Sequence, residues 1–145
     1  MAIAAGGQTL EIAPVTVERS SANIFRIILN PRADQPIAAL QWELLVPVGL
    51  EIKPEGVVTG AAADSAEKSL RCTNQNEPKE GRICACILAG GTQQIPAGAI
   101  AIVKLAATAD AQPGTTAVRL QRVQGVSAGL KRVVIADTKV EITIR

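Results

Sequence analysis

The sequence predicts an all-β sandwich, and three observations support that prediction. Apolar and polar residues alternate in short runs, which is the period of a half-buried strand. Turn residues separate these runs at fairly regular spacing, as in a sandwich of two sheets. Hydrophobic residues make up 48% of the 145 residues but aromatic residues only 1%, so the core of this one domain must be built from Ile, Leu, Val and Ala.

The N-terminal half supplies short strands bounded by prolines and turn residues. Residues 1–7 are expected to be a disordered or added segment in front of a domain that spans residues 8–145. The strands expected here are 9–17, where Pro14 favours an edge or a bulge, and 24–29, 38–46, 50–53 and 57–59. Residues 61–68, AAADSAEK, are rich in alanine and predict the only helix, of one or two turns.

The C-terminal half continues the series of strands. Residues 70–73 and 82–88 flank the polar segment NQNEPKEG, which predicts a long hairpin with a polar loop. Further strands are expected at 99–108, 115–123, 133–135 and 139–144, with the turn AQPG between the first two. The chain should therefore form eight or nine short strands and almost no helix.

The only tryptophan, Trp42, lies in an alternating run, AALQWELLVPVGLE. The residues on its side of the strand are apolar and those between them are polar: Leu40, Leu44 and Val46 against Gln41 and Glu43. A sugar-stacking platform would place the ring on the polar side, beside other exposed aromatic residues. We therefore expect Trp42 in the core, where burial of the ring adds about 2–3 kcal/mol of hydrophobic stabilisation.

Three cysteines, Cys72, Cys84 and Cys86, flank the expected hairpin loop. With the loop centred on Pro78, Cys72 stands directly opposite Cys84 and one diagonal step from Cys86, so a disulfide from Cys72 to either one is within reach. Such a bond closes a loop of about 13 to 15 residues and contributes about 3 kcal/mol in the chain-entropy model. The alternative is three buried free thiols. Three thiols without histidine make a poor zinc site, so no metal is expected.

Composition argues against several classes of function. The chain has no histidine, which removes the commonest general base and the Ser-His-Asp and Cys-His catalytic arrangements, so we expect no enzyme and no cofactor. A net charge of +2 without a basic run provides no electrostatic footprint for nucleic acid. The sequence has no run of about 18 apolar residues, so it predicts no membrane-spanning helix.

Several segments resemble the cohesin domain family, in the same order along the chain. The segment LQWELLVPVGLE resembles the family's third strand and GRICACILAGG its sixth; IPAGAIAIVKLAATADAQPGTTAVRL resembles its two strands around a Pro-Gly turn, and KVEITIR its closing strand. The resemblance covers residues 8 to 145. It implies a nine-strand jelly-roll sandwich, in a broad class that also contains carbohydrate-binding domains.

The resemblance also implies a function. In cohesins the eighth, third, sixth and fifth strands form the binding sheet, and the partner is a dockerin module that carries calcium. This chain is thus expected to be a non-catalytic protein-binding domain of a larger secreted protein, in an extracellular or cell-surface assembly. Gln41 and Glu43, which face outward on the third strand, are the candidate binding residues, against the alternative of a solvated polar face.

Two other functions stay open. The first is a carbohydrate-binding module with a polysaccharide ligand, which predicts exposed aromatic residues or an acidic metal-bearing cleft. The second is a structural spacer in a surface or secretion-apparatus protein. A spacer predicts a sheet face of scattered polar residues without a contiguous apolar patch.

Overall fold

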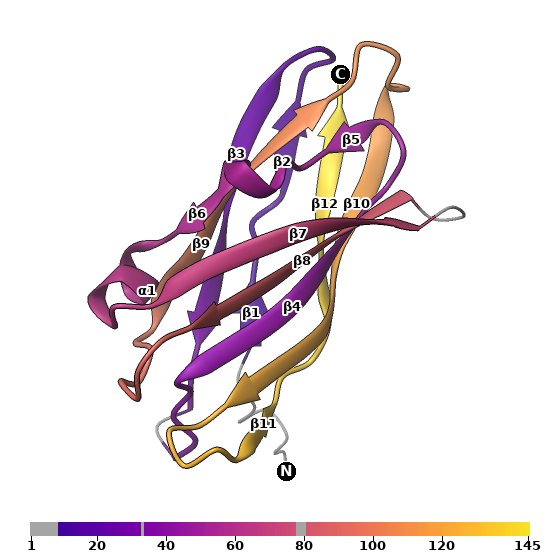
Figure 1. The fold of residues 1–145 in the computed structure, drawn as a ribbon. Coiled ribbons are helices and arrows are strands. Elements are labelled where there is room, and N and C mark those ends of the chain that lie inside the picture. The colour runs from indigo at the N-terminus through magenta and orange to yellow at the C-terminus, as the bar shows by residue number, and fades with distance from the viewer. Residues whose placement is uncertain (1–8, 33, 78–80) are drawn as a thin grey trace.

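Two β-sheets pack face to face in the computed structural model, which describes residues 9–32, 34–77 and 81–145 (Figure 1). One sheet has five strands, ordered β1-β3-β9-β5 with β6 beside β9: β1 (Thr9–Glu11), β3 (Ala22–Asn30), β9 (Gly98–Ala107), β5 (Leu50–Glu51) and β6 (Val57–Thr59). The other has seven, ordered β2-β12-β10-β4-β8-β7 with β11 beside β10: β2 (Val15–Val17), β12 (Thr138–Ile144), β10 (Gly114–Val126), β4 (Ala39–Val46), β8 (Gly81–Ala89), β7 (Ser69–Glu77) and β11 (Arg132–Val134). The predicted all-β sandwich is confirmed. The segment expected at residues 1–7 lies outside the described residues.

Each of the eleven segments expected as strands corresponds to a strand of the two sheets. The described ranges hold twelve strands in all, more than the eight or nine expected, because the short segments 57–59 and 133–135 form separate strands, β6 and β11, and the first expected strand is divided in two. Pro14 lies at that division, since it has no N–H to donate to a neighbouring strand. As a result β1 joins the five-stranded sheet and β2 the seven-stranded sheet. There β2 pairs with β12 in parallel, whereas the other paired strands are antiparallel.

The core between the sheets is mostly aliphatic. Alternate residues of each strand face inward, and in β4 the side chains of Leu40, Trp42 and Leu44 are at most 2% exposed. Both aromatic residues of the chain, Phe25 and Trp42, belong to this core, which confirms the prediction for Trp42. The indole Nε1 of Trp42 has no hydrogen-bond partner among the described residues, so the ring contributes by packing.

The predicted short helix is confirmed as α1 (Ala61–Ser65), which packs beside β9. Just after it, the buried Lys68 donates hydrogen bonds from Nζ to the carbonyl oxygens of Gly90 (2.7 Å) and Gly91 (3.4 Å). These bonds tie the start of β7 to the loop after β8. Burial lowers the pKa of Lys68, because desolvation disfavours its charged form. No helix in the described part of the chain is long and apolar enough to cross a membrane.

The β7–β8 hairpin is longer than predicted. The polar segment expected as its loop continues both strands instead, so that Glu77 pairs with Gly81. This register places Cys72 opposite Cys86 and Asn74 opposite Cys84, so the expected pairing of Cys72 with Cys84 is wrong by two residues. Polar residues can extend this strand because β7 lies at the edge of its sheet, where the backbone hydrogen bonds to β8 suffice for pairing.

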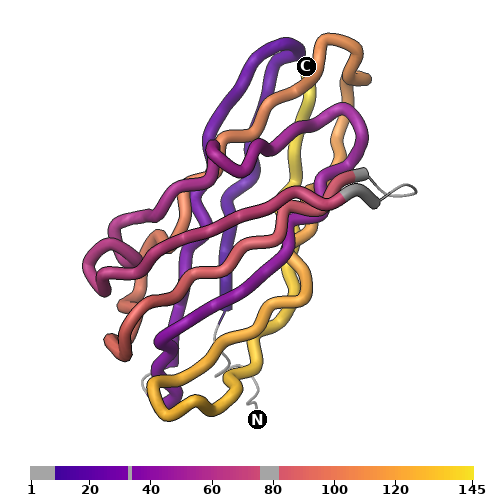
Figure 2. Tube along the Cα trace, viewed as in Figure 1, coloured from indigo at the N-terminus to yellow at the C-terminus, as the bar shows by residue number. Residues whose placement is uncertain are grey.

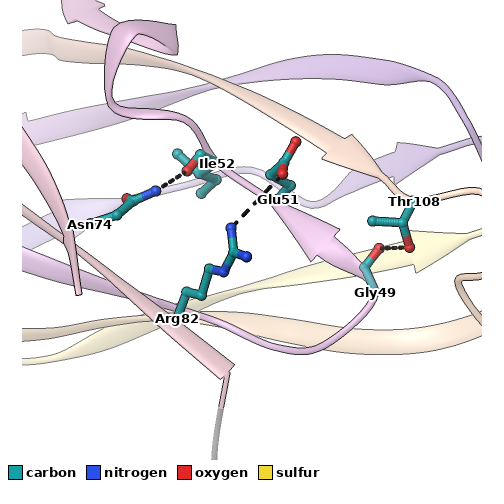
Figure 3. Close-up of polar contacts among 6 residues, drawn as sticks. All are labelled: Gly49, Glu51, Ile52, Asn74, Arg82 and Thr108. Carbon is teal, nitrogen blue, oxygen red and sulfur yellow. Dashed lines mark hydrogen bonds and ion pairs between the residues drawn. The ribbon is translucent and has the colours of Figure 1, made fainter. Parts of the chain in front are cut away.

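Polar contacts join this hairpin to the segment around β5 (Figure 3). Asn74 Nδ2 donates to the carbonyl oxygen of Ile52 (3.3 Å), and the guanidinium of Arg82 lies 3.9 Å from the carboxylate of Glu51. These two contacts connect the seven-stranded sheet to the five-stranded sheet. Thr108 Oγ1 donates to the carbonyl oxygen of Gly49 (3.4 Å), which holds the start of the same segment against the end of β9.

Candidate functional site

The four strands that the resemblance implies for binding lie side by side in the order β10-β4-β8-β7 and share one outward face. Cross-strand pairing arranges the outward side chains of this face in three rows. The rows are Arg119–Leu45–Ile83–Gln75, Gln121–Glu43–Ala85–Thr73 and Gln124–Gln41–Ile87–Arg71. These twelve residues, together with Arg122, are called the outer face below.

Both predicted binding residues, Gln41 and Glu43, lie on the outer face. Gln41 Nε2 donates to Gln124 Oε1 (3.0 Å), and Gln121 Nε2 donates to Glu43 Oε1 (3.3 Å). Glu43 Oε2 also lies 3.8 Å from the guanidinium of Arg122. Neighbours on β10 thus hold both side chains in place. Their contact with a partner stays a prediction.

An apolar strip occupies the centre of the outer face. It consists of Leu45 on β4 and of Ile83, Ala85 and Ile87 on β8. The strip is contiguous, because Leu45 is the cross-strand partner of Ile83 and alternate residues of β8 share one face. Ile87 is 55% exposed, whereas Leu45 and Ile83 are each only 9% exposed, although neither belongs to the core cluster between the sheets. The exposed part of the strip is therefore Ile87, with the half-buried Ala85 beside it. An exposed apolar side chain among polar neighbours is typical of the centre of a binding surface.

A β-bulge in β10 shapes the outer face next to Glu43. Gln121 pairs with Glu43 and Gln124 with Gln41, so three steps along β10 match two steps along β4. The extra residue gives Arg122 a φ of 51°, in the left-handed region, and leaves its side chain 74% exposed. Figure 2 shows β10 changing direction along its length, between its pairing with β12 and its pairing with β11.

A shallow hollow of about 500 Å³ lies beside this bulge. It is lined by polar and apolar residues of the outer face, among them Gln41, Glu43, Ile87 and Arg122, and also by Asp137, which adds a second carboxylate. A side chain inserted from a partner would therefore meet an apolar wall on β8 and hydrogen-bonding groups on β4 and β10.

The outer face is positively charged. It carries three arginines, Arg71, Arg119 and Arg122, but one carboxylate, Glu43. Arg122 is close to that carboxylate, whereas Arg71 and Arg119 form no ion pair with a side chain in the described ranges. Such a surface attracts an acidic partner.

The disulfide of the hairpin lies on the opposite, inner side of the same strands. It joins Cys72 to Cys86, one of the two predicted pairings, and leaves Cys84 as a buried free thiol. Cys84 Sγ is 3.9 Å from Cys86 Sγ. Desolvation by burial raises the pKa of the Cys84 thiol to about 11, so at neutral pH it is protonated and a poor nucleophile.

The sequence analysis missed the apolar strip and the arginines of the outer face. A signal for the strip was present, because β8 reads GRICACILA and is apolar at nearly every position after its first two residues. A strand with one solvated face needs apolar residues only at alternate positions, so this run indicates apolar side chains on both faces. Leu45, which breaks the alternation of β4, lies on the same outer face. No sequence signal marked the bulge at Arg122.

Comparison with known proteins relates this chain to one group of solved structures. No family model and no curated protein sequence matches it. The chain is similar to the non-cellulosomal cohesin from the hyperthermophilic archaeon Archaeoglobus fulgidus, with a TM-score of 0.72, 16% identity, and coverage of 96% of this chain and 91% of that chain.

Two further similar structures are complexes. One is a Clostridium acetobutylicum cohesin with a dockerin (TM-score 0.76, 14% identity, 95% of this chain and 99% of that chain). The other is a type I cohesin–dockerin complex from Clostridium thermocellum (TM-score 0.73, 11% identity, 96% and 99%). The fold of this chain is therefore that of a cohesin, as the resemblance of its segments implied.

Proposed function

We propose that this chain is a non-catalytic protein-binding module that binds a dockerin-like partner through its outer face. The observation that supports the proposal is the apolar strip of Leu45, Ile83, Ala85 and Ile87, whose exposed member Ile87 lies among polar and cationic side chains. Protein interfaces combine an apolar centre with a polar rim in this way. The strip lies on the four strands implied for binding by the cohesin resemblance, and two of the similar cohesins are in complex with dockerins.

The outer face also indicates the chemistry of the partner. The partner needs an apolar patch to cover Ile87, and carboxylates to meet Arg71 and Arg119. Calcium, in this proposal, is carried by the partner. Because exposed charges attract one another less at high ionic strength, we expect affinity to fall as salt is added.

We place the module outside the cell or at its surface, as a domain of a larger protein. The Cys72–Cys86 disulfide supports this location, because such bonds persist mainly in oxidising compartments. A polysaccharide ligand has less support, because Phe25 and Trp42 are both buried and the chain has no tyrosine. No aromatic ring is thus exposed for stacking against a sugar.

A calorimetric titration with a panel of recombinant dockerin modules tests the proposal. Each module is titrated into the domain in calcium and again after chelation with EGTA. We expect at least one module to bind with a micromolar or lower Kd in calcium and to lose binding after chelation. Ile87→Arg, which places a charge at the exposed end of the strip, should weaken that binding by about 30-fold or more, as expected for an interface hot spot.

Val58→Arg is the matched control. Val58 is 51% exposed against 55% for Ile87, but it lies on β6 in the five-stranded sheet. We expect this variant to bind like the unchanged domain, and Gln41→Ala and Glu43→Ala to weaken binding less than Ile87→Arg. Binding by none of the modules, or an equal loss in Ile87→Arg and Val58→Arg, would contradict the proposal.

A further inference from the structure

A cluster of three cysteine sulfurs lies in the core behind the outer face. The Sγ atoms of Cys72, Cys84 and Cys86 all lie within 4.8 Å of one another. Two of them form the disulfide, and the third, that of Cys84, is 3.9 Å from Cys86 Sγ. Partner binding through the outer face makes no use of this cluster.

The sheet itself sets the geometry of the cluster. Cys72 and Cys86 are a cross-strand pair, and Cys84 is two residues from Cys86 along β8, so all three side chains point to the inner side of the sheet. Pairing of β8 with β4 and with β7 holds the strand on both sides. Cys84 and Cys86 are each 1% exposed, whereas Cys72 is partly exposed on the edge strand β7 and offers access from that edge.

The spacing of the sulfurs suits one soft ion bound by three thiolates. Thiolates bind such ions at about 2.3 Å, which places three bound sulfurs roughly 3.4 to 4 Å apart, depending on how far the ion lies out of their plane. The Cys84–Cys86 distance of 3.9 Å falls in this range. Reduction of the disulfide turns its two sulfurs from bonded into non-bonded neighbours, and this is the change that opens the cluster to an ion.

Burial decides which charge the ion should carry. The cluster lies within the apolar core, where an uncompensated net charge is strongly unfavourable because it loses its hydration. Three thiolates leave a net negative charge around monovalent copper or divalent zinc, but they form a neutral complex with a trivalent ion. Zinc also prefers four ligands, and the chain has no histidine to supply the fourth.

We propose that the reduced domain binds one trivalent thiophilic ion, of the arsenite class, at Cys72, Cys84 and Cys86. In the first step a phosphine and one water molecule reduce the disulfide to two thiols, and the phosphine becomes its oxide. In the second step arsenous acid exchanges its three hydroxides for the three cysteine sulfurs. The three thiol protons leave with the hydroxides as three water molecules, so this step transfers no electrons and yields a neutral product.

The test is a titration of the phosphine-reduced chain with sodium arsenite. Native mass spectrometry counts the arsenic atoms bound and the hydrogens lost, and the fluorescence of Trp42 reports on the site because Trp42 is the cross-strand partner of Cys86. We expect one arsenic per chain with the loss of three hydrogens, together with a change in fluorescence. Cys84→Ala should bind at least about tenfold more weakly, because it retains two of the three sulfurs. The unreduced chain, with the same sequence and one free thiol, is the control that should bind none.

Three results would overturn the inference. Uptake of no arsenic by the reduced chain would exclude the site. Equal affinity of Cys84→Ala and the unchanged chain would mean that Cys72 and Cys86 capture arsenite without the third sulfur. Tighter binding of zinc than of arsenite would contradict the argument from charge. Thermal unfolding of unreduced Cys84→Ala, which keeps the disulfide, checks that this variant folds.

Discussion

Trp42 occupies a position where burial of the ring is favourable but burial of its N–H without a hydrogen-bond partner is not. The side chain is 1% exposed, and Nε1 has no hydrogen-bond partner among the described residues. An unpaired buried donor costs about 1–3 kcal/mol. Truncation of a buried tryptophan loses about 3–5 kcal/mol of packing, which is the larger effect, so the residue stabilises the fold as a whole.

Two substitutions of Trp42 separate these effects. We expect Trp42→Ala to lower the free energy of unfolding by about 3–5 kcal/mol. Trp42→Phe should lower it by less than about 2 kcal/mol, because it keeps most of the ring contacts and removes the unpaired N–H. Urea unfolding followed by far-UV circular dichroism measures both variants. Equal losses of the free energy of unfolding in the two variants would contradict the idea that the unpaired N–H destabilises the folded state.

At the scale of single elements, regular alternation predicted the strands well. Residues 38–46 were expected as a strand and form β4 (Ala39–Val46), and residues 139–144 form most of β12 (Thr138–Ile144). The same alternation correctly placed Gln41 and Glu43 on the outer face. It succeeded because one side of each strand faces an apolar core, so the polarity of a side chain indicates which face of the sheet it lies on.

Alternation could not predict how β7 pairs with β8. The end of β7 is polar, and its pairing rests on backbone hydrogen bonds that carry no side-chain signature. The cysteine register, and with it the choice of Cys86 over Cys84, depends on that pairing. The sequence also could not predict the bulge at Arg122, because arginine is not among the residues that favour a positive φ.

The left-handed backbone at Arg122 predicts how substitutions in β10 change stability. A φ of 51° costs a non-glycine residue about 1–2 kcal/mol, and a β-branched residue more. Arg122→Gly should therefore change the free energy of unfolding by less than about 1 kcal/mol, since relief of the backbone offsets the lost contact with Glu43. Arg122→Val should lower Tm by roughly 3–6 °C. Thermal unfolding measures the Tm of the two variants. Equal Tm values would argue against a left-handed residue at this position.

The disulfide on the edge strand β7 predicts how much stability the chain loses on reduction. Its cysteines are 14 residues apart, so reduction should lower the free energy of unfolding by about 3 kcal/mol through the entropy of the unfolded chain. Urea unfolding of the chain with and without a phosphine reductant measures this change. An unchanged midpoint would mean that hydrogen bonds and packing alone stabilise β7.

At the scale of the whole molecule, two buried titratable groups affect stability in opposite directions at high pH. Burial raises the pKa of Cys84 and lowers the pKa of Lys68, because in both cases it disfavours the charged form. Where only the unfolded thiol has lost its proton, the native state binds more protons and stability falls with rising pH. Where only the native lysine has lost its proton, the unfolded state binds more and stability rises.

The thiol contribution can be isolated by comparing the chain with Cys84→Ala, since Lys68 is present in both. The thiol pKa lies near 9.0 when exposed and at about 11 in the fold. Its stabilising effect should thus be complete below pH 9 and disappear between pH 9 and 11. We expect the unchanged chain to lose on the order of 1–2 kcal/mol more than Cys84→Ala across this interval, measured by urea unfolding. A loss of the same size in both chains would show that the folded thiol ionises normally.

The parallel pairing of β2 with β12 determines how the domain responds to mechanical force. Once β1 has separated from β3, tension applied at the two chain ends pulls β2 from its N-terminal side and β12 from its C-terminal side. Parallel strands loaded in this way slide along each other in shear, so the hydrogen bonds between Val15–Val17 and Ile142–Ile144 bear the load together. Arg145 adds to this group, because its N–H donates to Val17 O and its carbonyl oxygen accepts from Arg19 N–H (3.0 Å each). A hairpin pulled from its open end loses such bonds one at a time, so this domain should withstand stretching better than the short length of β2 suggests.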